Sequence, residues 1–144
     1  MNLYEFKIFV AENKKWFEGV NPETEEELSN YEQQLGFLLP ESLKWLLSSH
    51  GYSSSCGIDN LEESIQKTLE LRESIKLPNN ILVINDWGDA GIVFSIENEI
   101  IWASTADIYN LIEGQALPKE VDRFENYPSW VLERLENEQE ESEY

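Results

Sequence analysis

Apolar residues recur at helical spacing along the first third of the chain. Between residues 3 and 17 they predict a helix whose stripe consists of Leu3, Phe6, Phe9, Val10, Trp16 and Phe17. A second helix is predicted up to residue 35, and its buried face consists of Leu28, Tyr31 and Leu35. This helix begins either at Asn21–Pro22, an N-cap followed by proline, or one turn later at a capping box formed by Thr24 and Glu27.

The stretch from Leu35 to Gly51, LGFLLPESLKWLLSSHG, joins a helix end to the start of a new amphipathic helix. Gly36 stands where a helix exit favours positive φ. Pro40 stands in a first helical turn, where a backbone N–H is not needed. A buried face is predicted by the i, i+3, i+4 repeat of Leu43, Leu46 and Leu47. Gly51 ends this helix, so two helices are joined tightly enough to pack at a nearly fixed angle.

A polar segment and a longer helix follow. Residues 53–58 are small and polar, which favours a loop or a short strand. Asp59 or Asn60 then caps a helix to about Ile75, and one side of that helix carries Leu61, Ile65, Leu69 and Arg72. The breaker sequence LPNN at residues 77–80 ends it.

The second half of the chain consists of short apolar runs separated by turn residues. Residues 81–84, 92–96 and 100–104 are predicted strands, and their spacing describes an antiparallel meander. The first of these runs is apolar throughout, which indicates a strand covered on both faces. A short helix is expected over residues 107–112. A last helix opens at Pro128, with an inward side formed by Trp130, Val131 and Leu135.

These elements predict a single α+β domain over residues 1–144, with N-terminal helices packed on a mainly antiparallel sheet and a C-terminal helix. Residues 1–20 are expected to add an extra N-terminal helix. Residues 136–144 are acidic and almost without apolar side chains, so they are expected to fray. The expected core contains Leu35, Leu39, Leu43, Leu46, Leu47, Ile84, Val93 and Phe94.

The charge balance restricts the possible partners. The chain has 29 acidic and 10 basic side chains, a net charge of −19. Nucleic acid and anionic membranes carry the same sign, so neither is expected as a partner. No Lys or Arg occurs between Lys15 and Lys44, or between Lys76 and Lys119. Such a charge either serves solubility or attracts a basic protein rapidly.

Cysteine usage and the N-terminus indicate a cytoplasmic protein. Cys56 is the only cysteine, which excludes an internal disulfide and suits a reducing compartment. Glu5 and Lys7 interrupt the first ten residues, which lack the layout of a signal peptide. No apolar run approaches the ~18 residues of a membrane span.

Residue types that support catalysis are sparse. His50 is the only histidine and lies at a predicted helix end, where an imidazole serves as a dipole partner. Cys56 has no activating base that the sequence reveals. Asp86 and Asp89 have the layout of a carboxylate pair, but acidic residues beside glycine are also ordinary turn chemistry. One Cys and one His cannot form a structural zinc site. We therefore expect no enzyme, no metal site and no cofactor.

The tryptophans are the strongest functional candidates. Trp45 lies off the leucine stripe of its helix, Trp87 ends a predicted strand, and Trp102 lies within another. Each is either a core residue or an anchor for a partner, because large aromatics among carboxylates suit a protein-binding surface. The hypothetical binding residues are Asp86, Trp87, Asp89, Glu97, Glu99 and Trp102.

The helical connection resembles that of the SUKH superfamily, in which an acidic helix leads into an LG-x-x-LP step and an aromatic-rich helix with an Asn-Gly stop. The matching residues are Glu32, Leu35, Gly36, Leu39, Pro40, Leu46, Leu47 and Gly51. Leu43 replaces a usual aromatic, and His50 replaces a usual Asn. The order of the later strands and the late aromatic helix extends the resemblance over about residues 21–135, without the first helix.

The resemblance implies a function in protein binding. Many SUKH proteins are similar to bacterial immunity proteins, which neutralise polymorphic toxins, often basic nucleases, by direct contact. A cognate toxin domain is therefore the expected partner of this acidic chain. The alternative is a non-catalytic regulatory or scaffold module of the SUKH type, and a carboxylate-based hydrolase is a third reading. The oligomeric state is left open.

Overall fold

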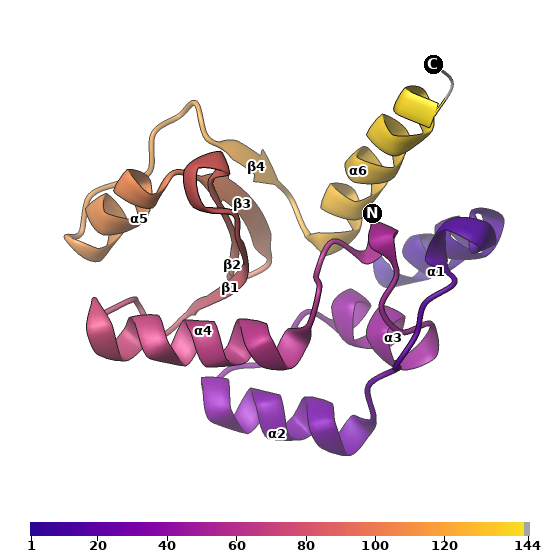
Figure 1. Cartoon of the computed structure of the whole chain (residues 1–144), viewed down its shortest axis with the longest axis horizontal. Coiled ribbons are helices and arrows are strands. Elements are labelled where there is room, and N and C mark those ends of the chain that lie inside the picture. Colours follow the sequence, from indigo (N-terminus) through magenta and orange to yellow (C-terminus); the bar gives the residue numbers. More distant parts are fainter. Residues whose placement is uncertain (143–144) are drawn as a thin grey trace.

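The fold of residues 1–142 is described by a computed structural model, with side chains for residues 1–140 (Figure 1). Helices come first, as predicted: α1 (Leu3–Glu12), η1 (Lys14–Phe17), α2 (Glu25–Leu35), α3 (Glu41–Ser49), η2 (Ser54–Cys56) and α4 (Leu61–Ser74). The sheet and the remaining helices follow: β1 (Ile81–Asp86), η3 (Gly88–Ala90), β2 (Ile92–Ile96), β3 (Glu99–Ala103), α5 (Thr105–Ile112), β4 (Asp122–Phe124) and α6 (Tyr127–Ser142). The α+β class and the C-terminal helix are therefore confirmed.

The first predicted helix is divided in two. α1 begins with a capping box between Asn2 and Glu5, and it ends at Asn13, whose backbone N–H and side-chain amide both donate to the carbonyl of Phe9. The chain continues as the 3₁₀ turn η1, which buries Phe17. Asn13 thus ends the α-helix by competing for its last carbonyl groups.

The connection between α2 and α3 has a carboxylate brace. α2 begins at the later of the two predicted sites, with Thr24 as N-cap, and ends at Gly36, whose φ is 82°. Pro40 precedes α3 instead of lying in its first turn. The Glu32 carboxylate accepts hydrogen bonds from the Leu39 backbone N–H at 2.7 Å and from Lys44 Nζ at 3.1 Å. One side chain of α2 therefore fixes both the connection and α3.

The sheet is an antiparallel meander in the order β1-β2-β3-β4. β1 to β3 agree with the predicted strands to within two residues, and β1 carries a register irregularity between Val83 and Asn85. β4 was not predicted, because its three residues are mostly exposed and have no apolar alternation. It forms only through pairing with β3, where Trp102 lies opposite Asp122.

Hydroxyl groups of α4 hold the β1 side of the sheet. Thr68 Oγ1 accepts a hydrogen bond from the Val83 backbone N–H at 2.9 Å, and Ser64 Oγ donates to the Ile84 carbonyl at 2.9 Å. Both polar residues are buried. Buried backbone groups of β1 are thereby satisfied by a helix, which also protects this edge from pairing with another chain.

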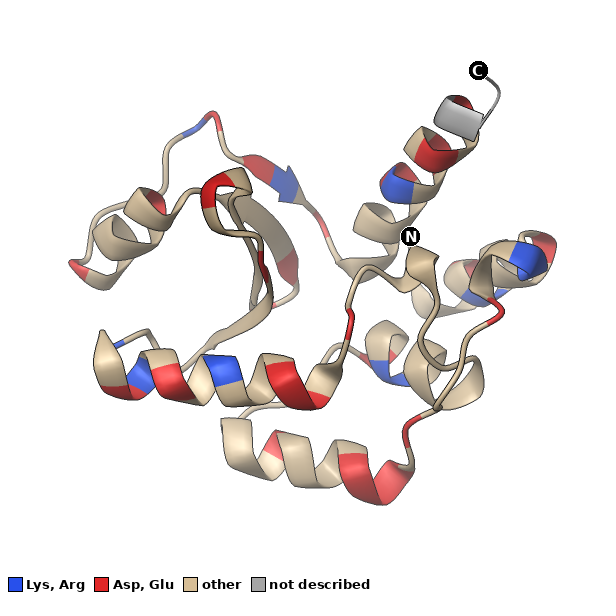
Figure 2. Ribbon diagram, viewed as in Figure 1, with Lys and Arg blue, Asp and Glu red and all other residues tan. Residues whose placement is uncertain are grey.

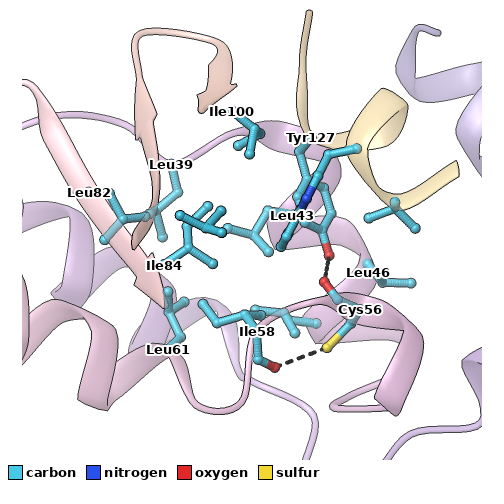
Figure 3. Packing of buried hydrophobic residues seen from close by; sticks show 14 of the residues in the cluster. Leu39, Leu43, Leu46, Cys56, Ile58, Leu61, Leu82, Ile84, Ile100 and Tyr127 are labelled. Carbon is cyan, nitrogen blue, oxygen red and sulfur yellow. Dashed lines mark hydrogen bonds between the residues drawn. The ribbon is translucent and has the colours of Figure 1, made fainter. Parts of the chain in front are cut away.

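Apolar side chains cover both faces of the sheet. Leu82, Ile84, Val93 and Ile100 belong to the larger cluster, which includes the inner faces of the N-terminal helices and α6 (Figure 3). A smaller cluster on the other face joins Ile81, Val83, Phe94 and Ile101 to Ile108 of α5. All eight predicted core residues are buried, namely Leu35, Leu39, Leu43, Leu46, Leu47, Ile84, Val93 and Phe94.

α6 packs on the segment around η2. The Tyr127 hydroxyl donates to the Cys56 carbonyl (Figure 3), and Ser55 Oγ donates to Glu138 Oε2 at 3.1 Å. A Cβ atom on Gly57 would lie 2.5 Å from the Trp130 ring, so glycine allows the close approach. The part of the tail expected to fray from residue 136 is helical to Ser142, and residues 143–144 lie outside the described part of the chain.

Candidate functional site

Trp87 and Trp102 form an aromatic pair at one end of the sheet. Trp87 follows β1 directly, and Trp102 lies on β3 opposite Val93 of β2. Their ring centroids are 5.3 Å apart with an interplanar angle of 77°, an edge-to-face arrangement. Trp102 remains 37% exposed. The structure thus brings together two of the three tryptophans that the sequence singled out.

The turn between β1 and β2 holds Trp102 in place. Its indole Nε1 donates to the Ala90 carbonyl at 2.8 Å. Gly91 has a φ of 111°, and a Cβ atom there would overlap the Trp102 ring and lie 2.8 Å from the Ala103 carbonyl. Only glycine fits this contact, so the position of Trp102 is built into the backbone of the turn.

Two acidic hollows lie beside the tryptophan pair. The hollow next to Trp102 measures about 310 Å³, and its acidic lining consists of Asp89, Asp107, Glu120 and Asp122. We call it the β4 hollow. The hollow next to Trp87 measures about 190 Å³ and lies against α4, with Asp59, Glu63, Asp86 and Lys67 among its lining residues. We call it the α4 hollow. Large aromatic rings are therefore flanked by carboxylates on two sides.

The six predicted binding residues fall into two groups. Asp86, Trp87, Asp89 and Trp102 lie at the tryptophan end, each beside one of the two hollows. Glu97 and Glu99 lie at the opposite turn, because β2 and β3 run the length of the sheet between the two ends. Along β3, Glu99 lies three residues from Trp102, which corresponds to roughly 10 Å. The two groups therefore lie at opposite ends of the β2–β3 hairpin.

Tertiary contacts bring cations to a region that is free of Lys and Arg in the sequence. Lys67 of α4 lies 3.7 Å from Asp86, and Arg123 of β4 lies 3.2 Å from Glu99. Both pairs are partly exposed, so each contributes little to stability. Among the described residues Asp89 and Asp122 make no ion pair, and the β4 hollow has no basic residue in its lining. Of the two hollows, the one beside Trp102 therefore carries the unbalanced negative charge.

Three of the four carboxylates in this hollow, Asp107, Glu120 and Asp122, are not among the binding residues predicted from the sequence. Glu120 precedes β4 and Asp122 begins it, and the sequence pattern did not predict this strand. Asp107 lies in the stretch without Lys or Arg between Lys76 and Lys119, and it caps α5 by accepting the Ser104 backbone N–H at 3.1 Å. The available signal was the acidic content of residues 120–125, but nothing local indicated that they pair with β3.

The carboxylate of Glu23, away from the tryptophan pair, is buried and accepts hydrogen bonds from two tyrosines. Tyr52 donates its hydroxyl to Glu23 Oε1 at 2.6 Å, and Tyr31 donates to Oε2 at 3.5 Å. The Leu61 backbone N–H in turn donates to the Tyr52 oxygen at 3.0 Å. Burial raises the pKa of Tyr31 to about 12 and raises that of Tyr52 further, so both hydroxyls keep their protons. This network joins the start of α2 to the start of α4.

Glu23 makes the stability of this network depend on pH. Burial raises its pKa above the ordinary value of 4.5, and the nearby Glu27 carboxylate raises it further. The stabilisation from protonated Glu23 is fully present below pH 4.5 and is lost as the pH rises through the folded-state pKa. The pKa of Glu27 shifts in the opposite direction, because its hydrogen bond with Glu23 lowers it.

Replacement of Glu23 by glutamine should reduce the loss of stability between pH 4.5 and neutral pH, because the amide is uncharged throughout this range. Urea unfolding at both pH values measures the effect. The matched control is Glu26→Gln, an exposed carboxylate of the same helix start. Equal destabilisation by Glu23→Gln at both pH values would contradict the prediction, since it would show that the titration of Glu23 does not contribute to the pH dependence of stability.

The histidine and the cysteine lie in packed surroundings. The His50 ring contacts Trp45 edge to face at 5.3 Å, at the C-cap of α3. Cys56 is fully buried, and its Sγ donates to the Ile58 carbonyl at 3.1 Å (Figure 3). Burial raises the pKa of this thiol, which disfavours the reactive thiolate. In the part of the chain that the structure describes, no three metal-binding side chains come together.

The order of the elements, with the LG-x-x-LP connection between α2 and α3, defines a SUKH-type α+β domain. A family model, SUKH_5, described as SMI1-KNR4 cell-wall, matches residues 6–113. Because the match covers three quarters of the 144 residues, the chain belongs to this family and is an SMI1/KNR4-like protein. The SUKH resemblance is thus confirmed. No curated protein and no solved structure shows significant similarity to the chain.

The family match has different limits from the resemblance drawn from the motif. It begins within α1 and ends after α5, so it includes the N-terminal helix that the resemblance left out. It stops before β4 and α6. The matched region thus contains Trp87 and Trp102, but not Glu120 or Asp122. Of the described helices, none is both long and apolar enough to cross a bilayer.

Proposed function

We propose that this protein is a cytoplasmic immunity protein without catalytic activity, which binds and neutralises a cognate toxin by direct contact. The observation that carries the proposal is the tryptophan pair, with Trp102 exposed and Trp87 half-buried, beside the acidic β4 hollow. SUKH membership supports it, because the superfamily is rich in immunity proteins. The proposed contact residues are Asp86, Trp87, Asp89 and Trp102, with Glu97 and Glu99 as a second, outer contact.

Charge complementarity supports a basic partner, and a nuclease toxin is the partner class that we propose. A nuclease must carry positive charge to hold phosphate, so its active groove is complementary to a chain of net charge −19. Figure 2 shows acidic segments at the β1–β2 turn, at β4 and at the first turns of α2 and α4. Long-range attraction of this kind raises the association rate more than the final affinity.

The tryptophan pair supplies the apolar part of the proposed contact. Trp is enriched among the residues that dominate binding energy, particularly where surrounding polar groups exclude water. Trp102 is oriented by the Ala90 carbonyl and by the Gly91 backbone. Its side chain is therefore already ordered in the free protein, and binding costs it little conformational entropy. The carboxylates then raise the rate of association with the toxin, and the tryptophan rings slow the dissociation of the complex.

A regulatory or scaffold module is the second candidate. The match to the SMI1-KNR4 cell-wall family is compatible with this candidate as well. It requires the same type of protein-binding surface but no toxin. A long secreted protein with a C-terminal toxin domain encoded next to this gene would favour the immunity role, and its absence would favour the scaffold.

Charge reversal at the β4 hollow tests the proposed surface. The double variant Asp89→Lys/Asp122→Lys should reduce the association rate with the neighbouring toxin domain about tenfold or more at low salt, and it should weaken the salt dependence. Association is measured by stopped-flow or surface plasmon resonance. Protection is measured by co-expression with the toxin.

The matched control is Glu136→Lys/Glu140→Lys, which makes the same charge change at exposed positions of α6. It should retain protection and most of the association rate. Loss of protection in the α6 variant alone would move the interface to the C-terminal helix. Glu97→Lys/Glu99→Lys forms a third arm and reports whether the opposite turn is also in contact.

A further inference from the structure

Arg134 of α6 lies against Trp87, one member of the tryptophan pair. Its guanidinium carbon is 5.1 Å from the centre of the Trp130 ring and 6.0 Å from that of Trp87. Trp87 in turn contacts Trp102 at 5.3 Å. A continuous row of contacts therefore leads from the buried Trp130, through Arg134, to the exposed Trp102.

Arg134 has no polar group that accounts for its position. Its Nε atom is buried and makes no hydrogen bond, and within the described residues it forms no ion pair. This is unusual in a chain with 29 acidic side chains. A planar guanidinium is more weakly hydrated than an ammonium group and stacks on aromatic faces. The rings of Trp130 and Trp87 therefore hold Arg134 in place, and Arg134 in turn packs against both rings.

The two partners of Arg134 differ in how firmly they are held. Trp130 lies on α6 and packs against Gly57. The same helix is held to Cys56 by the hydrogen bond from the Tyr127 hydroxyl. Trp87 is half-buried and begins the short turn η3, where Gly88 has a φ of 60°. Helix α6 thus supports the Trp87 side chain beside η3, and it does so through the guanidinium of Arg134.

We propose that Arg134 is a positioning residue, which holds Trp87, and through it Trp102, in the orientation that the toxin contacts. This inference rests on the proposed function for its role in binding, although the positioning itself is a property of the free protein. α6 lies outside the matched residues 6–113, so this support comes from a part of the chain that the family model does not describe.

The test compares Arg134→Lys with Arg72→Lys. Arg72 is a matched control because its guanidinium also lies over a ring, that of Phe37 at 5.8 Å, and its Nε is likewise buried without a hydrogen bond. Lysine keeps the charge in both variants and removes the planar stack. Arg134→Gln is a second variant at the same position, planar but uncharged, in case the lysine variant does not fold.

Two measurements separate the steps of the inference. The first is the far-ultraviolet circular dichroism couplet of the coupled indoles, which Trp87→Phe identifies in the free protein. We expect Arg134→Lys to weaken this couplet and Arg72→Lys to leave it unchanged. The second is the dissociation rate of the toxin domain, which we expect Arg134→Lys to raise about 3- to 30-fold. Arg72→Lys should leave it unchanged, although both variants lose the planar stack of a guanidinium on a ring.

An unchanged couplet in both Arg134 variants overturns the positioning role, whatever the toxin does. A weakened couplet with an unchanged dissociation rate overturns the link to binding, provided that Trp87→Ala still accelerates release. If Trp87→Ala and Trp102→Ala both leave toxin binding intact, the proposed surface is wrong, and the couplet still decides whether Arg134 positions the pair. The failure of the inference and the failure of the proposed function are therefore distinguishable.

Discussion

Truncation of Trp102 to alanine should shorten the lifetime of the toxin complex at a cost of about 2–4 kcal/mol in binding free energy. The physical reason is that Trp102 offers an exposed, oriented ring beside carboxylates that a basic partner neutralises. The effect should appear in the dissociation rate, because removal of the ring leaves the acidic charges that steer association. Trp87→Ala should act in the same direction, since the two rings support each other at 5.3 Å.

Surface plasmon resonance with the purified toxin domain measures both rate constants. Tyr4→Ala is the matched control, because Tyr4 is a 73% exposed aromatic on α1, an element that contributes nothing to the tryptophan pair. Urea unfolding of each variant separates lost binding from lost folding. An unchanged dissociation rate for Trp102→Ala, together with a folded variant, would remove this residue from the interface.

Truncation of Leu46 to alanine should lower the free energy of unfolding by about 2–5 kcal/mol. Leu46 is completely buried on the inner face of α3, in the cluster that joins the N-terminal helices to α6 and the sheet. The smaller side chain loses apolar burial and leaves a cavity, because the surrounding helices relax only in part. A loss of this size is a large part of the stability of a domain of this length.

Chemical denaturation provides the measurement, and Leu38→Ala provides the control. Leu38 is 79% exposed in the connection between α2 and α3, so the same substitution there should change stability by less than about 0.5 kcal/mol. A loss below about 0.5 kcal/mol for Leu46→Ala would mean that this face of α3 is not packed, which would contradict the fold.

The sequence alone was sufficient for the elements whose signals are local. Helix α2 has a capping threonine and an exit glycine, and α3 has a leucine stripe, so both were predicted nearly to their ends. The runs of residues 81–84 and 92–96 identified their strands because continuous β-branched residues favour a covered sheet. Capping and periodicity act within a few residues, and a single sequence displays them directly.

Features that depend on residues distant in the chain were decided only by the tertiary structure. β4 has no local signal and forms because β3 offers it a partner. Lys67 and Arg123 enter a region that is free of basic residues in the sequence, and the length of β2 and β3 separates Glu97 and Glu99 from the tryptophan pair.

The candidate site shows the same division. The sequence identified tryptophans among carboxylates, since Trp87 and Asp89 are visible beside a predicted turn and Trp102 within a predicted strand. Their grouping depended on strand register, and the support from Arg134 depended on how a helix some forty residues later packs against them. Local spacing determines which side chains are available for binding. Packing between distant segments determines which of them meet, because contacts across the fold leave no periodic trace in the sequence.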